Sequence, residues 1–356
     1  MKQKNRSLFL RSAYIMTLVA LISTTQKAPA ESQTTPNTPA QITLSTEQKK
    51  ALMARPKKII GLVPVRNEEQ YIDQCLRGLA LYTDAIIVLD DASTDHTVAI
   101  VQSIAKECNV ATIIKKNVWV RDEPGDRNKL LQAGRAIGGT HFIVMDADEM
   151  FTAPCLKNNI LRTKILAMEP GDKLSFHWIR LWKSLDKFRL ERDEKQKRPD
   201  GTSKTFCDIR PFIFCDDGES AYHSNFIHTS RYPSTLAAGT ISGIGDVEVY
   251  GVLHFQAVNW RNMRVRQAWY RCLEHIRTPE KDINLINRCY AASESDDNSA
   301  IFSCAASWFA YPFFDRKAYE APEQWREKEI LSWFTQYGMR FFADLDIWDI
   351  DWGAGV

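Results

Sequence analysis

The sequence predicts an α/β fold in which a mostly parallel sheet is covered by helices on both faces. Short, continuous apolar runs alternate with segments of helical spacing between residues 57 and 148. Strands that are apolar throughout are typical of parallel sheets buried on both sides. Polar residues follow several of these runs, and in such sheets ligands bind at the carboxyl ends of the strands. The fold class therefore also predicts where a site lies.

The first half of the predicted sheet consists of strands that alternate with helices. The strands are apolar runs, expected at 57–65, 85–90, 109–116 and 141–146. The helices carry apolar residues every three or four positions, and are expected at 66–82, 93–107 and 126–136. Asp95, with Ser93 and Thr94 before it, is a capping candidate for the second of these helices.

Beyond Asp148 the alternation is less regular. Helical spacing is found at 155–168, at 260–276 and from residue 323, and strands are expected at 173–182, 205–215 and 245–255. Residues 187–201 are predicted to be a charged loop. We expect a main domain over 57–260 and a helical, aromatic-rich C-terminal extension over 261–356.

The N-terminus has the layout of a secretory signal. Basic residues precede an uncharged run at 12–26, and "APA" follows at 28–30. The run is shorter than the roughly 20 residues of a membrane span. Residues 1–30 are predicted to be a signal peptide or an uncleaved anchor, and 31–56 a flexible stem. The body is expected to be exported or lumenal, with a membrane-anchored form as an alternative and a cytoplasmic protein if the segment is not functional.

Composition gives few further indications. The chain has 356 residues, of which 44% are hydrophobic and 25% charged, and its net charge of +2 gives no indication of nucleic-acid binding. None of its eight cysteines shows C-x-x-C metal spacing. Cys207 and Cys215, which flank one apolar stretch, are candidates for a disulfide, and free buried thiols are the alternative.

The segment "HFIVMDADEM" (141–150) leads a buried strand directly into Asp146, Asp148 and Glu149. Burying unpaired carboxylates is costly, so a cation or a set of hydrogen-bond donors is expected there. Asp146 and Asp148 alternate on an extended segment and face the same side, whereas Glu149 faces the other. Mg²⁺ commonly binds one or two carboxylates together with phosphates and water. The rival interpretation is the D-x-D-x-T motif of haloacid-dehalogenase phosphatases, but Met150 stands where that motif needs Thr or Val.

Four segments, taken in order, resemble the family 2 glycosyltransferases of the GT-A fold. They are "VPVRNEE", "IIVLDDASTDHT", "DRNKLLQAG" and "HFIVMDADEM". The resemblance is clearest over 58–150 and weaker to about residue 260. It implies a metal-dependent, hexosyltransferase-like enzyme that uses Mn²⁺ or Mg²⁺ and moves a sugar from a UDP- or GDP-sugar to an acceptor hydroxyl, with inversion. The acceptor, a glycan, glycolipid or protein, is left open. A non-catalytic carbohydrate-binding protein that keeps the fold is the alternative.

The same resemblance implies roles for individual residues. The donor would be bound by Pro64, Arg66, Asn67, Asp91, Arg127 and Asp146. In this set Asp91 would contact the base, and Arg127 would reach the diphosphate unless it is a solvated helix-face arginine. The metal would be held by Asp146, Asp148 and His254, with His228 as the competing histidine.

A catalytic base for an inverting reaction is expected in "CDDGES" (215–220). Asp217, with Asp216 beside it, is the candidate. A plain Asp-Gly turn explains the same residues.

Overall fold

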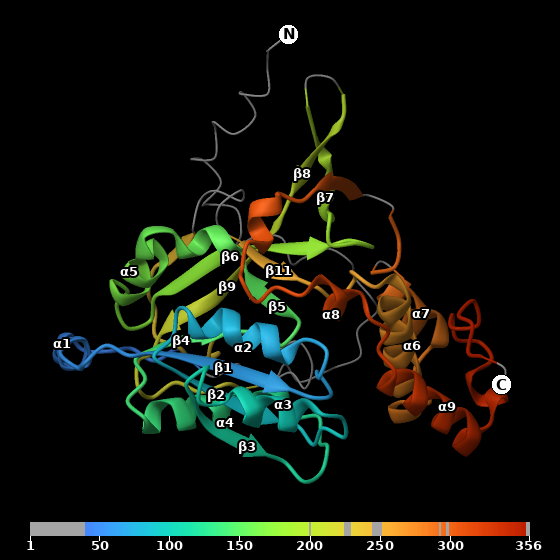
Figure 1. Cartoon of the computed structure of the whole chain (residues 1–356), viewed down its shortest axis with the longest axis horizontal. Helices are drawn as coiled ribbons and strands as arrows, with labels where there is room; N and C mark the ends of the chain where they lie inside the picture. The colour runs from blue at the N-terminus through green and yellow to red at the C-terminus, as the bar shows by residue number, and fades with distance from the viewer. Residues whose placement is uncertain are drawn as a thin grey trace. The chain divides into compact units, whose positions relative to one another are not determined.

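The computed structural model describes residues 40–198, 201–223, 229–243, 251–291, 293–296 and 299–353. One sheet runs through this part of the chain in the order β12-β7-β6-β9-β4-β1-β2-β3 (Figure 1). The predicted signal segment and His228 lie outside the described residues. Within them, no helix combines the length and the apolar character needed to cross a membrane.

The parallel part of the sheet is the part that the sequence predicts. The four strands are β1 (Ile59–Val65), β2 (Ala85–Asp90), β3 (Val110–Lys115) and β4 (His141–Val144). They pair in parallel in the order β3-β2-β1-β4. The connecting helices are α2 (Ile72–Ala80), α3 (Thr97–Ile104) and α4 (Glu123–Ala136). The predicted fold class is confirmed.

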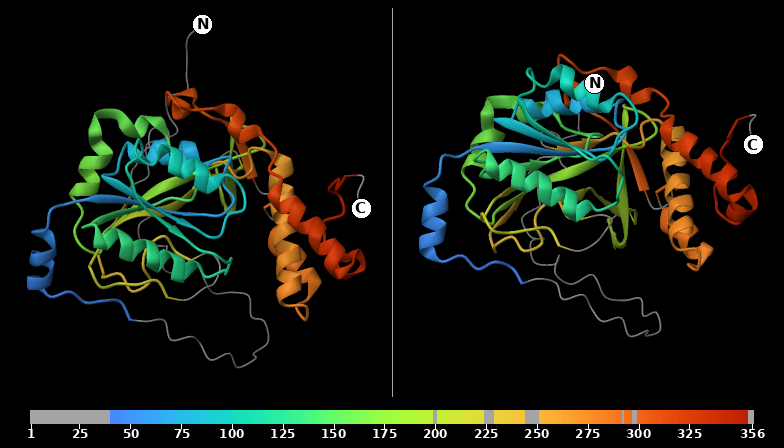
Figure 2. Two further views of the ribbon diagram at one scale, coloured as in Figure 1. Left: turned by 60° about the horizontal axis from the view of Figure 1, so that its bottom comes forward. Right: turned by 90° about the horizontal axis from the view of Figure 1, so that it is seen from below.

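Helices cover both faces of this sheet (Figure 2). Along β1, Ile59 and Val63 pack into a core cluster that includes residues of α2 and α3. Ile60 and Leu62 point the other way and pack with Leu130 of α4. Successive side chains of a strand point to opposite faces, so a strand buried on both sides must be apolar at every position.

The second half of the sheet is antiparallel. Strand β9 (Asp208–Cys215) pairs with β4 on one side and with β6 (Lys173–Leu181) on the other. Beyond β6 lie β7 (Lys187–Lys197), its hairpin partner β8 (Ser203–Phe206) and the edge strand β12 (Ser299–Ser303).

The prediction of a charged loop at 187–201 is wrong, because most of this segment forms β7. Its apolar residues Phe188 and Leu190 alternate with charged ones and pack into a core cluster. That period of two is visible only at the start of the strand. Further along, the charged residues lie in the β7–β8 hairpin, which needs no buried face to keep its backbone hydrogen bonds.

Three short strands bring later parts of the chain to the end of β4. Strand β11 (Gly251–His254) lies parallel to β6 and antiparallel to β5 (Glu149–Phe151), which places His254 opposite Glu149. Strand β10 (Ile241–Gly243) pairs with β6. A 3-10 turn (Ala153–Asn159) and α5 (Ile160–Leu166) follow β5.

The C-terminal extension is helical and aromatic-rich, as predicted. Its helices are α6 (Trp260–Arg277), α7 (Ile283–Ala291), α8 (Arg316–Glu320) and α9 (Trp325–Tyr337). Helices α6, α7 and α9 share a cluster with the aromatic tail. The expected stem contains a helix, α1 (Thr46–Met53), which a capping box of Ser45 and Gln48 begins.

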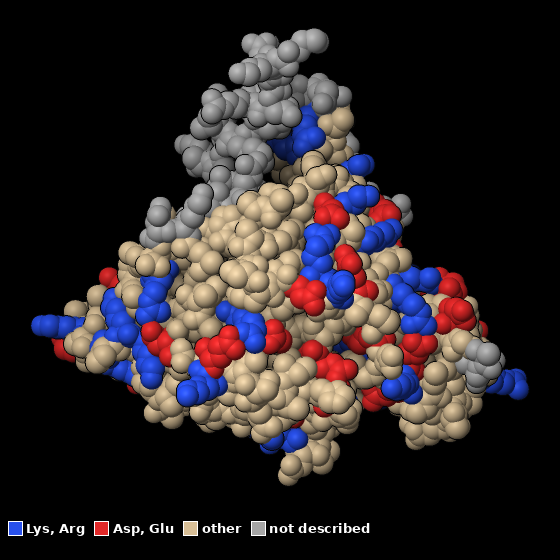
Figure 3. Space-filling model, in the orientation of Figure 1, with Lys and Arg blue, Asp and Glu red and all other residues tan. Residues whose placement is uncertain are grey.

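Cationic and anionic side chains are interspersed over the face of the protein that Figure 3 shows. This distribution agrees with a net charge of +2 and gives that face no large patch of one sign.

The predicted Cys207–Cys215 disulfide is wrong, because all eight cysteines are free. Cys207 precedes β9 and Cys215 ends it. Eight residues of extended strand separate their Cα atoms by about 26 Å, whereas a disulfide needs less than about 7 Å. The alternative of free thiols is therefore confirmed.

His141, the first residue of β4, makes stability depend on pH. Its ring is 1% exposed, and burial lowers its pKa to about 4. Below pH 6.5 His141 is protonated in the unfolded chain but stays neutral in the folded protein. The free energy of unfolding therefore falls as the pH falls toward 4. We expect a loss of about 2 kcal/mol between pH 7 and pH 5 from this group alone. Urea unfolding of the wild type and of His141→Gln at both pH values measures the contribution of His141 to this loss. An equal pH dependence in the two proteins would contradict the assignment.

Candidate active site

The loops that follow β1 and β2 are tied to each other. Arg66 Nη1 donates hydrogen bonds to the carbonyl oxygens of Asp91 and Ala92 at 3.0 and 3.2 Å. Asn67 adopts a left-handed conformation with φ of 52°, and its Oδ1 accepts a hydrogen bond from the Thr94 amide at 2.7 Å. The Oδ1 of Asn67 thereby ties the loop after β1 to the loop after β2.

The acidic residue after β2 lies on a pocket wall. Asp91 Oδ1 is 2.6 Å from Lys116 Nζ. Burial raises the pKa of Asp91, and Lys116 opposes that effect. Pro64, which pairs with Leu89 near the end of β1, is half-buried. Pro64, Arg66 and Asp91 therefore all stand at the edge of the sheet where the sequence predicted them.

Asp146 and Glu149 share one buried arginine that sequence reasoning missed. Arg231 Nη2 lies 2.9 Å from Asp146 Oδ2 and 2.7 Å from Glu149 Oε1. Glu149 also accepts hydrogen bonds from Trp178 Nε1 at 2.7 Å and from the Asp146 amide at 3.1 Å. Glu149 is fully enclosed, whereas the Asp146 side chain is 38% exposed. The prediction that Glu149 faces away from Asp146 is wrong, because the chain turns at residues 147–148 and both carboxylates contact the same Arg231 nitrogen.

Asp148 faces two cationic or ionisable groups. Its Oδ2 is 2.9 Å from Arg266 Nη1 on α6 and 3.6 Å from His254 Nε2 on β11. Burial alone would raise the pKa of Asp148, but His254 and Arg266 outweigh it and hold the pKa well below its usual range. The His254 ring stacks on Trp178, with 4.4 Å between the ring centroids. Asp148 is therefore an anion at neutral pH, and its predicted histidine neighbour is in place.

Arg127 is not a solvated helix-face arginine. Only 8% of the residue is exposed, and its Nη2 is 3.7 Å from Asp146 Oδ1. Among the residues that the structure describes, its Nε and Nη1 are buried without a hydrogen-bond partner. A buried guanidinium with unused donors is costly, and a ligand with several oxygen acceptors would satisfy it.

Asp216 and Asp217 do not lie at this site. Asp216 forms a two-point ion pair with Arg135, with distances of 2.9 and 2.7 Å. Asp217 accepts backbone hydrogen bonds, including one from Ala237 at 2.7 Å, and its side chain is 0% exposed. Cys215, the residue before Asp216, pairs with His141 at the start of β4. About 16 Å of strand separates that end from Asp146. Their role is structural, and the turn interpretation of "CDDGES" replaces that of a catalytic base.

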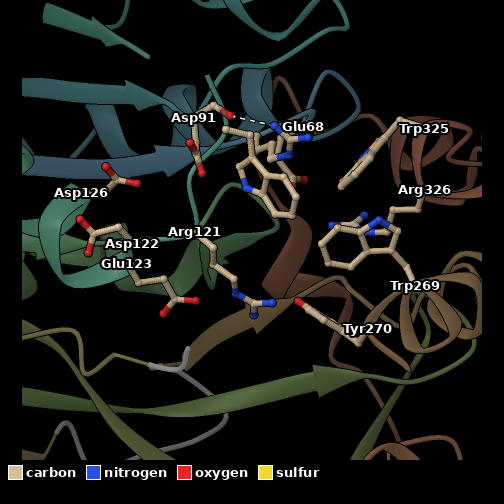
Figure 4. A pocket seen from close by; sticks show the side chains of 12 residues that line it. Glu68, Asp91, Arg121, Asp122, Glu123, Asp126, Trp269, Tyr270, Trp325 and Arg326 are labelled. Atoms are coloured by element: carbon tan, nitrogen blue, oxygen red, sulfur yellow. Dashed lines mark hydrogen bonds between the residues drawn. The ribbon is translucent and has the colours of Figure 1, made fainter. Parts of the chain in front are cut away.

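A pocket of about 200 Å³ opens between the sheet edge and the C-terminal extension. One wall carries residues of the β1, β2 and β3 loops, and the other carries aromatic and basic residues of α6 and α9 (Figure 4). Sequence reasoning missed the aromatic and basic lining residues Trp119, Arg121, Trp269, Tyr270, Trp325 and Arg326, and the acidic ones Glu68, Asp122, Glu123 and Asp126. The C-terminal extension therefore supplies part of the lining of this pocket.

The residues predicted to hold a metal are close but not assembled. Within the described ranges, no group of three or more His, Cys, Asp or Glu residues has the geometry to hold a metal ion. Arg231 and Arg266 already neutralise Asp146 and Asp148. Two carboxylates and an imidazole are nevertheless ligands that suit Mn²⁺. The chemistry of these side chains therefore fits the ion, although their arrangement is not that of a formed metal site.

Residues 62–161, which include the second half of β1, all of β2 to β4 and both acidic loops, match the model of glycosyl transferase family 2. This segment belongs to that family. The match favours the glycosyltransferase interpretation of D-x-D over the phosphatase one. No curated protein matches the chain.

Several solved structures resemble the chain at low similarity. TarS 1-349 from S. aureus is 18% identical over 59% of this chain and 64% of its own, with a TM-score of 0.35. The chain thus spans less than two thirds of that relative. PcManGT, a mannosyltransferase from Pyrobaculum calidifontis solved with GDP-Man and Mn²⁺, is 15% identical over 66% of this chain and 71% of its own, with a TM-score of 0.35. Glucosyl-3-phosphoglycerate synthase from Mycobacterium tuberculosis is 21% identical over 32% and 42%, with a TM-score of 0.20. Scores this low do not support a transfer of substrate or mechanism.

Proposed function

We propose that the chain is a glycosyltransferase that moves a hexose from a nucleotide-sugar donor to an acceptor hydroxyl. The observation that supports this most directly is Arg127, which is buried beside Asp146 with two unused nitrogen donors. The diphosphate of a UDP- or GDP-sugar carries oxygens that would satisfy them. Negative charge grows on that diphosphate as the sugar leaves, and a fixed guanidinium stabilises it.

Asp146, Asp148 and His254 are the residues that would hold Mn²⁺ or Mg²⁺. When bound, such an ion supplies Lewis-acid stabilisation of the leaving diphosphate. Two features of the protein support binding of the ion: Asp148 is ionised at neutral pH, and Arg231 holds Asp146 and Glu149 in place. We also propose that the transfer inverts the anomeric configuration of the sugar, because the resemblance to family 2 glycosyltransferases implies it.

The proposal is tested by thermal shift and by donor hydrolysis. A nucleoside diphosphate at 100 times its dissociation constant should add about 2.7 kcal/mol of stability, and only when Mn²⁺ is present. Slow Mn²⁺-dependent hydrolysis of a UDP- or GDP-sugar distinguishes the enzyme from a non-catalytic carbohydrate-binding protein. Binding of sugar without any turnover of either donor would favour the binding protein.

His254→Ala should raise the Mn²⁺ concentration needed for this stabilisation by about tenfold or more, because the ion loses its imidazole ligand. The matched control is His96→Ala, because the His96 ring is exposed and pairs with Glu69 in a loop. A Mn²⁺ titration at fixed UDP measures the shift in both variants. An unchanged Mn²⁺ requirement in His254→Ala would remove His254 from the ligand set and return His228 as the candidate.

Export remains part of the proposal, on the basis of the basic, apolar and "APA" layout of residues 1–30. Intact-mass measurement of protein from its native host tests it. A mature protein that begins at Glu31 supports cleavage, and an intact N-terminus in a cytosolic fraction contradicts export.

A further inference from the structure

Both faces of the Trp178 ring are covered by groups from neighbouring strands. Strand β6 lies between β9 and β11 at this point, since Trp178 pairs with Asp208 of β9 and with Val252 of β11. From the β11 side, the His254 ring stacks on the indole, with 4.4 Å between the ring centroids and 25° between the planes. From the β9 side, Arg210 Cζ lies 3.8 Å from the Trp178 ring centroid. The indole is therefore held between two side chains.

A third contact fixes the edge of the same ring. Trp178 Nε1 donates a hydrogen bond to Glu149 Oε1 at 2.7 Å. Glu149 is itself held by Arg231 and by the Asp146 amide, at 2.7 and 3.1 Å. Cross-strand aromatic contacts and a hydrogen bond together restrict both the plane of an indole and its rotation within that plane. Trp178 is thus a rigid, flat surface beside His254.

The His254 ring is oriented by this surface. Its polar and aromatic contacts in the described part of the chain are the stack on Trp178 and the approach of Nε2 to Asp148 Oδ2 at 3.6 Å. A histidine that binds a metal is usually oriented by a hydrogen bond from its second ring nitrogen to a carboxylate, a carbonyl or water. Since His254 makes no such hydrogen bond to another described residue, the stack on the indole sets the plane of its ring.

We propose that Trp178 is a positioning residue, which holds the His254 imidazole in the plane in which Nε2 faces Asp148. Without the flat ring the imidazole could rotate away, and a divalent cation would bind Asp148 and His254 with lower affinity. The inference rests on the proposed function, because the orientation of His254 matters to transfer only through that cation. It goes beyond the proposed function by giving a role to a residue of β6 that is not itself a ligand.

The test uses the full chain and measures binding rather than turnover. The melting temperature is followed at a fixed, saturating concentration of UDP while Mn²⁺ is titrated, and the Mn²⁺ concentration for half of the stabilisation is compared between variants. In Trp178→Leu, which has no planar ring, this concentration should rise about tenfold. In Trp178→Phe it should stay within about threefold of the wild type, because phenylalanine keeps a ring for the stack and Glu149 keeps Arg231.

Trp182→Leu is the matched control. The Trp182 indole also donates to a carboxylate, Asp296 at 2.6 Å, and an arginine also covers it, with Arg189 Cζ 4.5 Å from its ring centroid. Its aromatic neighbour is Trp260 rather than a histidine. This variant should lower the melting temperature without changing the Mn²⁺ requirement. If Trp178→Leu does not fold, Trp178→Met takes its place, because methionine fills gaps with a flexible chain that has no planar ring.

A double-mutant cycle decides whether Trp178 acts through His254. In a His254→Ala background, Trp178→Leu should add no further shift in the Mn²⁺ requirement, because the group that it positions is gone. Equal shifts in both backgrounds, or equal shifts for Trp178→Leu and Trp178→Phe, overturn the inference. An unchanged requirement in Trp178→Leu also overturns it and leaves the glycosyltransferase proposal standing. If the wild type itself shows no Mn²⁺-dependent stabilisation by UDP, the proposed function fails, and the role of Trp178 fails with it.

Discussion

Asp148→Asn is expected to abolish sugar transfer and to lower the free energy of unfolding by about 3 kcal/mol. Its carboxylate lies 2.9 Å from Arg266, and both side chains are 8% exposed. Neutralising the aspartate removes the shorter of the two ion pairs of this buried guanidinium and leaves it with Glu323, whose Oε2 is 3.7 Å from Arg266 Nη2. Glu68 cannot compensate, because burial raises its pKa to about 8 and it is largely protonated at neutral pH. The loss is measured by urea unfolding without metal, and the activity by donor turnover with Mn²⁺.

Asp146→Asn is the matched control. The Asp146 side chain is 38% exposed, and its partner Arg231 keeps a second carboxylate in Glu149. The stability change should stay under about 1 kcal/mol, while transfer is lost. An Asp148→Asn protein as stable as the wild type would show that Arg266 is not held by Asp148. The sequence alone suggests the opposite sign, because two neighbouring carboxylates repel and neutralising one relieves them.

The parallel half of the fold could be predicted because a strand that is buried on both faces is apolar at nearly every residue, which is visible in the sequence. Each residue of β2 is buried, and "AIIVLD" is apolar until its last position. A strand with one exposed face has a weaker pattern, because only every second residue needs to be apolar. In β7 the alternation of Phe188 and Leu190 with charged residues gives way to a run in which every residue is charged or polar. The composition of this segment therefore resembles that of a loop, although its backbone pairs with β6, β8 and β12 as a strand.

The acidic half of the site could be predicted for a related reason. Asp91 and Asp146 directly follow apolar strands, and the ends of neighbouring parallel strands meet. The basic partners of Asp146 and Asp148 could not be predicted, because Arg231 and Arg266 come from a later loop and a C-terminal helix. Nothing local distinguishes them from other arginines. Asp217 was misplaced for the converse reason, since antiparallel pairing carries the end of β9 to the start of β4 rather than to its end.

Arg231→Met is expected to lower the free energy of unfolding by about 3 kcal/mol at pH 8 and by less at pH 5. Arg231 is the cation nearest to the buried Glu149 carboxylate, at 2.7 Å, and its guanidinium also lies 4.5 Å from the Phe212 ring centroid. Methionine keeps the packing but leaves Glu149 buried and unpaired. Burial already raises the pKa of Glu149, and loss of the arginine raises it further.

The sign of the pH effect follows from that direction. A carboxyl whose pKa is raised in the folded state stabilises the fold while it is protonated, and this stability is lost as the pH rises through the folded pKa. Arg231→Met should therefore lose stability steeply between pH 5 and pH 8, and Arg231→Met/Glu149→Gln should not, because the amide carries no charge to bury. Arg210→Met, which removes a half-exposed arginine stacked on Trp178, should cost under about 1 kcal/mol at either pH. Urea unfolding of the three variants at both pH values decides it. If Glu149→Gln fails to restore Arg231→Met, the arginine acts through packing or Asp146, and Glu149 is not the group that it neutralises.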